Sequence, residues 1–507
     1  MRRLAAFICL IPFVPIVLII LAGFIFYRTV IRLILWCKYG QHFKGLLQGA
    51  DAMWCVSETD CGVVNILCFI EPSKHGQNTA KDILQILRKR VNAVKKYPSN
   101  KFSKAFWKRN HAFGYAFWSN DLNLDIVDMI RTIDTEMNID EARLREIVSD
   151  LSTAKLPANH SAACEILIGN QAVKDKPRGS ARYFILFRFH HSLGDGYSVL
   201  HFILTEIADL GNYSECMPSL NNFKKRSIRE SIALVISSVY NIPAYLFRVM
   251  SHEQHANDWQ IDALGSSKIT CWQNESSVLE SNRWHQLLEN IHIKLSRVQY
   301  SSVLLTALSG TLYNYFKAKG QYPKFLTVAS PIRIRHQDPT DMQFENAFVT
   351  PMKKLKLSPG VELSDPNRAV KLKYRLAQLK QSTVELRSSS DMLITRWMMS
   401  FLPGIFPGPL LTFLAKQFRI IASISVMPPL AKRIHIGMYE LHDMFYWPPA
   451  FGTVGFNFAV LSYAGELQLA LLADRQMLRS HNEGQQLLRE LFLEIERMNI
   501  VLRECAL

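Results

Sequence analysis

The segment His190–Gly196, which reads HHSLGDG, constrains the fold of this chain more than any other feature. It directly follows the apolar run Tyr183–Phe189, and that run predicts a buried β-strand that ends at the two histidines. Neighbouring strand residues point to opposite faces of a sheet. His190 and His191 therefore cannot both line one pocket, so one of them faces a candidate site while the other packs or orients it.

The same segment has the composition of a proton-transfer site. An imidazole titrates near pH ~6.5, so at neutral pH it can accept a proton from a hydroxyl group. Asp195 can fix the tautomer of such a ring or hold the turn through a nearby cation, and Gly196 permits a backbone conformation that is closed to other residues. A half-buried histidine pair before an ordinary Asp-Gly turn is the alternative interpretation.

Hydrophobic periodicity predicts strands and helices in alternation along both halves of the chain, which indicates an α/β fold. The predicted strands are 63–70, 165–168, 183–189, 325–332, 347–352, 421–426, 454–463 and 466–472. The predicted helices are 80–96, 139–151, 198–210, 299–319, 368–381 and 484–504. Residues 211–265 lack clear strands, and we expect them to connect the two halves.

Composition narrows the class of protein. The 507 residues are 49% hydrophobic, which is enough to bury one large core or two medium ones. The formal net charge of +16 is compatible with nucleic acid, anionic lipid or a phosphate-bearing ligand. Because the charges are scattered and no helix-turn-helix or zinc-finger spacing occurs, we expect no nucleic-acid partner. The nine cysteines are irregularly spaced without a CxxC pair, so we expect neither a disulfide framework nor a bound metal.

The amino-terminal region predicts a membrane anchor. Leu4–Tyr27 is apolar and uncharged over 24 residues, which is long enough to cross ~30 Å of hydrocarbon. Basic residues are more numerous after this stretch than before it, which favours a cytosolic body, while Pro12 and Pro15 also allow a re-entrant hairpin. We therefore expect a membrane protein of the endoplasmic reticulum, with the lipid droplet and the plasma membrane as alternatives.

Two later stretches, 232–250 and 398–421, are also strongly apolar. The second contains the Pro- and Gly-rich run Phe401–Leu411, which argues against a regular transmembrane helix. We expect each stretch to be either an ordinary core helix or a surface that lies on a membrane.

Together these segments resemble the wax ester synthase/diacylglycerol acyltransferase family, which belongs to the HHxxxDG acyltransferases related to chloramphenicol acetyltransferase. The resemblance extends over roughly residues 47–500. The matching segments are Gly49–Trp54, Phe117–Trp118, Leu122–Asp125, His190–Gly196, Ser330–Arg333, Glu345–Asn346, Leu461–Leu467 and Asp474. The sequence departs from the pattern of the family at Ala162–Glu165, Ser301–Ser302 and Ser425–Pro429.

The resemblance implies an α/β fold with two chloramphenicol acetyltransferase-like subdomains around a central tunnel, preceded by an N-terminal membrane helix. On this basis residues 1–40 form the anchor and residues 41–210 form the N-terminal subdomain with the HHxxxDG motif. Residues 211–265 form a crossover that can touch the membrane, and residues 266–507 form the C-terminal subdomain.

The resemblance also implies acyl transfer from acyl-CoA, as co-substrate and without a further cofactor, to a lipid alcohol. The acceptor is a long-chain alcohol, which gives a wax ester, or diacylglycerol, which gives triacylglycerol. The motif residues His190, Asp195 and Gly196 shape the site around His191, the implied general base. Three residues of the second half are candidate contacts to substrate or CoA: Arg333, Asn346 and Ser425.

Two other functions stay open at this stage. A membrane-anchored lipid-binding protein on the same scaffold fits the weakened accessory motifs. A glycerolipid-type acyltransferase uses an NHxxxxD motif, and Asn159–Glu165 comes close to it but ends in glutamate. A serine hydrolase is not expected because no GxSxG motif occurs.

Overall fold

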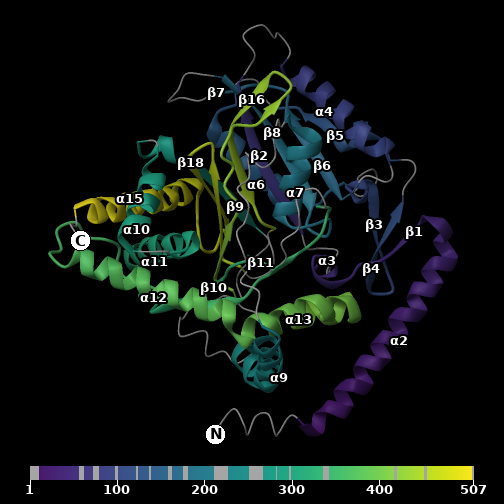
Figure 1. The fold of residues 1–507 in the computed structure, drawn as a ribbon. Coiled ribbons are helices and arrows are strands. Elements are labelled where there is room, and N and C mark those ends of the chain that lie inside the picture. Colours follow the sequence, from purple (N-terminus) through teal and green to yellow (C-terminus); the bar gives the residue numbers. More distant parts are fainter. Residues whose placement is uncertain are drawn as a thin grey trace.

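Two mixed β-sheets form the centre of the molecule, and helices pack around them (Figure 1). The first sheet has seven strands and carries the HHSLGDG segment at the end of one of them, and the second sheet has six strands. The computed structural model describes residues 11–55, 62–71, 79–97, 101–120, 124–135, 139–157, 163–174, 181–209, 227–250, 267–280, 282–295, 298–334, 342–415, 420–449 and 454–504.

The first sheet has the strand order β15-β16-β2-β8-β6-β5, with β7 paired to β8. Its central strands β2, β8 and β6 are antiparallel and buried on both faces, which explains why they read as continuous apolar runs. Helices α4 (Thr79–Lys96), α6 (Glu141–Thr153) and α7 (Gly196–Phe202) contribute to its core. The strands are β2 (Val63–Ile70), β5 (Ile130–Ile133), β6 (Cys164–Gly169), β7 (Val173–Lys174), β8 (Ala181–His190), β15 (His435–Ile436) and β16 (Tyr439–Trp447).

The second sheet has the strand order β13-β10-β14-β17-β18-β9. Helices α10 (Arg283–Leu295), α11 (Tyr300–Ala318) and α15 (His481–Glu504) bury their apolar faces against it and complete a second hydrophobic core. The strands are β9 (Lys268–Asn274), β10 (Phe325–Ala329), β13 (Met352–Lys356), β14 (Ala422–Val426), β17 (Phe456–Tyr463) and β18 (Glu466–Asp474).

Smaller elements complete the described part of the chain. A three-stranded sheet has the order β1-β4-β3, and a two-stranded sheet pairs β11 with β12. These strands are β1 (Phe43–Leu46), β3 (Trp107–Ala112), β4 (Tyr115–Asn120), β11 (Ile332–Arg333) and β12 (Phe348–Val349). The other α-helices are α2 (Val14–Tyr39), α3 (Gly49–Met53), α5 (Ile126–Met129), α9 (Ile228–Met250), α12 (Arg368–Ser388), α13 (Ser390–Ile405) and α14 (Gly408–Ala415).

The second half of the chain contributes two strands to the first sheet. Strands β15 and β16 come from the expected C-terminal subdomain 266–507, yet they extend the first sheet, where Phe445 lies opposite Leu67. Asp443 of β16 accepts hydrogen bonds from Arg182 of β8 at 2.8 Å, Asn274 of β9 at 3.0 Å and Gln468 of β18 at 3.2 Å. One buried carboxylate therefore ties the first sheet to the second.

The predicted α/β class is confirmed, and most predicted elements are present with shifted ends. The predicted strands 325–332 and 347–352 are each broken in two, because β11 and β12 leave the second sheet and pair with each other. The predicted helix 198–210 becomes α-helix only to Phe202 and continues as a π-helical turn over Ile203–Ile207. Strands β3, β9 and β16 were not predicted, since their mixed polar residues give no clear apolar run.

Two described helices are long and apolar enough to cross a membrane, by length and composition. The first covers Val14–His42, so it extends beyond the predicted anchor, whose first residues lie outside the described ranges. The second covers Ile228–Phe247, within the segment expected to connect the two halves. The apolar stretch 398–421 forms the end of α13 and then α14, and α13 continues through Pro403.

Removal of the Asp443 carboxylate should weaken the junction of the two sheets. We expect Asp443→Ala to lower the free energy of unfolding by about 3–5 kcal/mol, because it leaves the buried Arg182 guanidinium without its counter-charge. Chemical denaturation of the detergent-solubilised protein measures this change. The partly exposed carboxylate of Glu440, which pairs with Arg433, provides the control, and Glu440→Ala should cost less than about 1 kcal/mol. Equal effects of the two substitutions would contradict this account of the junction.

Candidate active site

The two histidines at the end of β8 point in different directions, as the strand geometry predicts. His191 stacks on Trp54, with ring centroids 4.1 Å apart and an interplanar angle of 13°, and it lies 5.4 Å from the Phe348 ring. Its backbone N–H donates to the carbonyl of Gly62 at 2.7 Å. The ring is thus held between aromatic side chains from both halves of the chain, and the residue keeps 8% of its surface exposed.

The hydrogen bonds of Asn346 determine which nitrogen of His191 carries the proton. The Asn346 Nδ2 amide donates to Asp51 Oδ1 at 2.8 Å and to the His191 carbonyl at 2.7 Å. Both partners are acceptors, so the amide oxygen of Asn346 must be the atom 2.9 Å from His191 Nδ1. Nδ1 therefore donates, and Nε2 has the free lone pair. No described residue forms a hydrogen bond with Nε2.

The surroundings keep the His191 ring neutral. Burial lowers the pKa of His191 to about 4, and this effect outweighs its own backbone carbonyl, the Asp195 charge and the Asn346 hydrogen bond, which all act in the opposite direction. At neutral pH the ring is therefore an uncharged imidazole whose Nε2 can accept a proton.

His190 has a structural position instead. Its Nε2 accepts from Arg109, 2.7 Å away, and its Nδ1 lies 2.7 Å from Ser192 Oγ. Burial and, secondarily, the Arg109 guanidinium hold the pKa of His190 well below its usual value. Because both ring nitrogens are occupied, His190 has no free position for a substrate proton.

Asp195 and Gly194 join the motif to the second half of the chain. Asp195 caps α7 by accepting from the Ser198 N–H at 2.9 Å, and it also accepts from the Ala347 N–H at 3.1 Å. Its own N–H donates to the Glu345 carbonyl at 2.9 Å. A Cβ on Gly194 would lie 2.2 Å from Ser198 Oγ and 3.0 Å from the Glu345 backbone. The motif thus holds the segment that carries Asn346. The sequence offered two roles for Asp195, and these contacts agree with the second, in which Asp195 holds the turn.

The expectation for Gly196 is wrong. Its φ does not lie in the left-handed region, and the residue begins helix α7 in an ordinary conformation. A Cβ there would meet only the Met427 side chain, with its sulfur at 3.0 Å. The residue of the motif that needs to be glycine for close packing is Gly194.

The three candidate substrate contacts lie in different settings. Arg333 is largely buried, 3.6 Å from Asp195 and 4.0 Å from Glu345, and its guanidinium covers the Tyr197 ring at 3.9 Å. The Arg333 charge thus lies between two carboxylates and an aromatic ring of the protein itself. Asn346 contacts His191 directly, as described above. Ser425 on β14 is half-buried, and its carbonyl accepts from the Tyr446 hydroxyl at 2.7 Å.

Residues that sequence analysis did not single out complete the surroundings of the ring. Lys104 Nζ lies 2.6 Å from Asp51 Oδ2 and donates to the Ser192 and Leu193 carbonyls, each at 3.0 Å. Burial raises the pKa of Asp51, and the nearby Lys104 opposes that rise. The segment Gly49–Trp54 contained a signal for Asp51 and Trp54, whereas Lys104 lies in a stretch without a predicted element.

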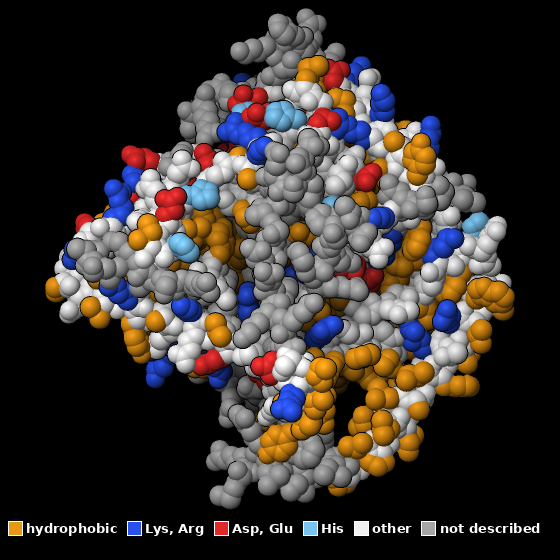
Figure 2. Space-filling view, in the orientation of Figure 1, with side chains coloured by type: hydrophobic (Ala, Val, Ile, Leu, Met, Phe, Trp, Pro, Cys, Tyr) orange, Lys and Arg blue, Asp and Glu red, His pale blue; other side chains and the backbone are white. Residues whose placement is uncertain are grey.

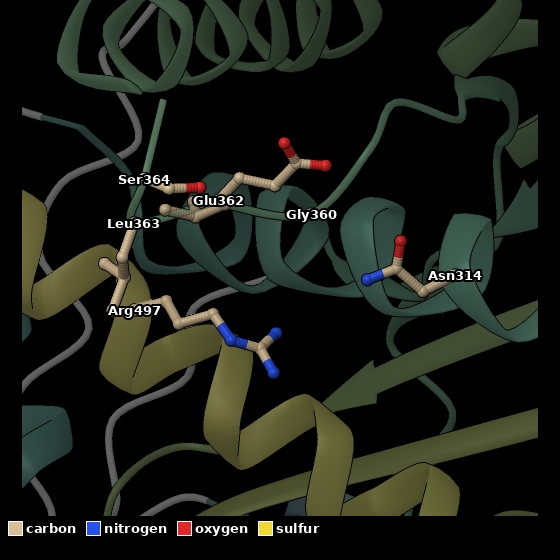
Figure 3. A pocket seen from close by; sticks show the side chains of 7 residues that line it. Asn314, Gly360, Glu362, Leu363, Ser364 and Arg497 are labelled. Atoms are coloured by element: carbon tan, nitrogen blue, oxygen red, sulfur yellow. The ribbon is translucent and has the colours of Figure 1, made fainter. Parts of the chain in front are cut away.

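Two of the cavities on the described surface include no residue of the HHSLGDG motif. Both lie along α11 and α15 of the second core, and Figure 3 shows the first, with Glu362 and Arg497 among the side chains that line it. The expected central tunnel to His191 therefore stays a prediction. No group of three or more side chains suited to a metal ion occurs within the described ranges. The alternative motif at Asn159–Glu165 lies mostly outside those ranges.

The contrast between the two glycines can be tested directly. We expect Gly194→Ala to destabilise the protein by about 1–3 kcal/mol, because the new methyl group collides with backbone atoms of Glu345. Gly196→Ala should cost less than about 1 kcal/mol, since the Met427 side chain can move. Denaturant midpoints of the two variants measure the difference, and a Gly196→Ala variant that is the less stable of the pair would refute the assignment.

Comparisons with known proteins agree with this fold. The WS/DGAT C-terminal domain matches residues 362–498. Among solved structures, the wax ester synthase/diacylglycerol acyltransferase from Marinobacter aquaeolei VT8 superposes with a TM-score of 0.56 at 13% identity, covering 90% of this chain and 100% of that one. Trichothecene 15-O-acetyltransferase from Fusarium sporotrichioides gives a TM-score of 0.61 at 10% identity, covering 90% and 94%. Comparison with curated protein sequences gives no match.

The first condensation domain of the calcium-dependent antibiotic synthetase has the same fold, with a TM-score of 0.53 at 11% identity over 90% of this chain and 96% of that domain. At such identities the solved structures show the fold alone, which is an α/β fold of two related halves, as the resemblance implies. Residues 362–498 of this chain are similar to the WS/DGAT C-terminal domain, the domain of wax ester synthases and diacylglycerol acyltransferases.

Proposed function

We propose that this protein is a membrane-bound O-acyltransferase that moves a fatty acyl group from acyl-CoA to a lipid alcohol. The acceptor is a long-chain alcohol, which gives a wax ester, or diacylglycerol, which gives triacylglycerol. The observation that carries the proposal is the neutral His191 ring, whose Nδ1 is held by Asn346 and whose Nε2 is free to act as a base. The similarity of residues 362–498 to the WS/DGAT C-terminal domain supports the reaction class.

In the proposed reaction His191 Nε2 removes the proton from the acceptor hydroxyl while the oxygen attacks the thioester carbonyl. A tetrahedral intermediate forms, with the negative charge on the former carbonyl oxygen. When the carbon–sulfur bond breaks, CoA leaves as thiolate and takes the proton from the imidazolium. The products are the ester and CoA, and His191 is neutral again.

Asn346 is proposed as the positioning residue for this cycle. Its amide oxygen can accept from Nδ1–H both before and after Nε2 takes the proton, so the ring need not turn over. The orientation of the amide is itself fixed by Asp51, which Lys104 holds in turn. Trp54 covers one face of the ring and Phe348 lies beside it, and together they would exclude water from the reacting atoms.

The apolar helix α2 supports attachment to a membrane, and we propose the endoplasmic reticulum with a cytosolic body, where acyl-CoA is accessible. A lipid-binding protein without catalysis is the alternative. It would bind acyl chains without forming an ester.

The decisive experiment removes the base. Membranes that carry the protein are incubated with labelled acyl-CoA and a panel of alcohols, and ester formation is followed. We expect His191→Ala to lose at least ~10²–10⁴-fold in rate, because a positioned base contributes about that factor. The half-exposed His435, paired with Glu440, gives the matched control, and His435→Ala should keep the wild-type rate. An unchanged rate in His191→Ala rejects the mechanism, and acyl-chain binding without ester in the wild type favours the lipid-binding alternative.

The pH profile gives an independent test. Because burial lowers the pKa of His191 to about 4, the ring stays a competent base throughout the neutral range and loses that ability only as the pH falls through about 4. We therefore expect the acid limb of kcat/KM near pH 4, below the ~6.5 of a solvated imidazole. Samples returned to pH 7 should regain full activity, which excludes unfolding. A limb near pH 6.5 would mean that the ring is hydrated and would contradict the buried site.

A further inference from the structure

Exposed apolar side chains gather on one side of the molecule. They come from the first half of α2, from α9, α13 and α14, and from the β3–β4 turn. We call this set the apolar face, and Figure 2 shows its hydrophobic side chains along α2 and beside it. Its members include Ile19 (72% exposed), Phe26 (72%), Phe113 (55%), Ile236 (65%), Phe401 (60%) and Phe413 (63%).

Contacts between these elements make the apolar face continuous. Phe24 of α2 meets Phe406, which follows α13, edge to face at 5.1 Å. The Gly408 N–H at the start of α14 donates to the Gly114 carbonyl of the β3–β4 turn at 2.7 Å. On the other side of α13, Thr395 and Tyr245 of α9 bring their hydroxyl groups to 2.9 Å. Four helices and a turn therefore form one surface.

Helix α2 indicates what covers this face. Its second half packs on the three-stranded sheet, where Ile31 and Leu35 are buried, and it carries the first cations of the helix, Arg28 and Arg32. The uncharged stretch Leu4–Tyr27 is long enough to cross a bilayer. The boundary between hydrocarbon and water thus falls near Arg28, at the level where Tyr27 donates to the Phe113 carbonyl and the rest of the apolar face begins.

The inner side of α13 touches the candidate active site. Met392 and Met399 belong to a small cluster with Trp54 and Phe348, the two side chains that cover His191. A Cβ on Gly49 would lie 3.4 Å from the Ser400 carbonyl, so α3 and α13 are in close contact. The side chains of Met392 and Met399 and the rings of Trp54 and Phe348 therefore lie between α13 and the His191 ring.

We propose that the apolar face rests on a lipid bilayer and that the acceptor lipid passes from the bilayer to His191 along α13, beside Met392 and Met399. The route rests on the function proposed above, whereas the contact with the bilayer does not. Methionine suits such a route because its unbranched side chain repacks easily around different chains. A bilayer is the occupant rather than a protein partner, because the face is continuous with a helix that already fits the hydrocarbon thickness.

The bilayer contact is tested without any activity measurement. The full chain is reconstituted in phosphatidylcholine vesicles with a fluorescent amino acid in place of Phe413, and the acyl chains of the lipid are brominated. We expect at least twofold quenching of this probe. Met438 gives the control, because it is 75% exposed in the β15–β16 turn and belongs to the first sheet rather than to the apolar face. Equal fluorescence at position 413 with and without bromine would overturn the bilayer contact.

The route is tested by the ratio of two rates in the same vesicles, for hexadecanol dissolved in the bilayer and for water-soluble hexanol. Met392→Trp places a larger side chain beside Trp54 and Phe348, and we expect it to lower the hexadecanol-to-hexanol ratio at least tenfold. Met392→Leu conserves the volume and should keep the ratio within twofold. A ratio that Met392→Trp leaves unchanged overturns the route. If wild-type protein esterifies neither alcohol, nor diacylglycerol, the proposed function fails, and the quenching experiment still decides the bilayer contact.

Discussion

The hydrogen bond between His191 Nδ1 and the Asn346 amide oxygen joins residues that are 155 positions apart. It matters because a histidine can be a base only at the nitrogen that lacks a proton, and this bond leaves the lone pair at Nε2. The bond is itself directional, since the amide nitrogen of Asn346 is used by Asp51 and by the His191 carbonyl. The proposed chemistry therefore requires both halves of the chain to be in place.

The rest of the HHSLGDG segment keeps those halves together. Asp195 accepts from Ala347 and caps α7, and Gly194 leaves room for the Glu345 backbone. These contacts surround Asn346 on both sides in the sequence. Most residues of the HHSLGDG segment thus fix the geometry of the segment around Asn346. Only the His191 ring takes part in the proposed proton transfer. Strands β15 and β16 of the second half extend the first sheet, and the buried Asp443 of β16 strengthens the junction of the two halves.

The apolar face lies on one side of the molecule, next to the helix that contacts the surroundings of His191. A neutral, dehydrated imidazole is well suited to an alcohol that is itself dissolved in hydrocarbon, because neither partner must cross bulk water. In the proposed arrangement α13 contacts the bilayer with Phe401 and the aromatic partners of His191 with Met399. Arg333 is largely buried between Asp195 and the Tyr197 ring, so in the proposed reaction other cations would bind the CoA phosphates.

The sequence by itself determined the α/β class, the buried strand that ends at His190, and the opposite directions of the two neighbouring histidines. These features depend on the periodicity of the hydrophobic residues and on local backbone geometry, and residues close in sequence specify both. It also marked the apolar stretches from which the apolar face is built. It did not reveal Lys104 and Arg109, the partner of His191 Nδ1, or the role of Gly194. Those depend on contacts between distant segments, and no local pattern records which backbone will lie 3.0 Å from a glycine or which amide will meet a ring nitrogen. Only the packing of the two halves decided them.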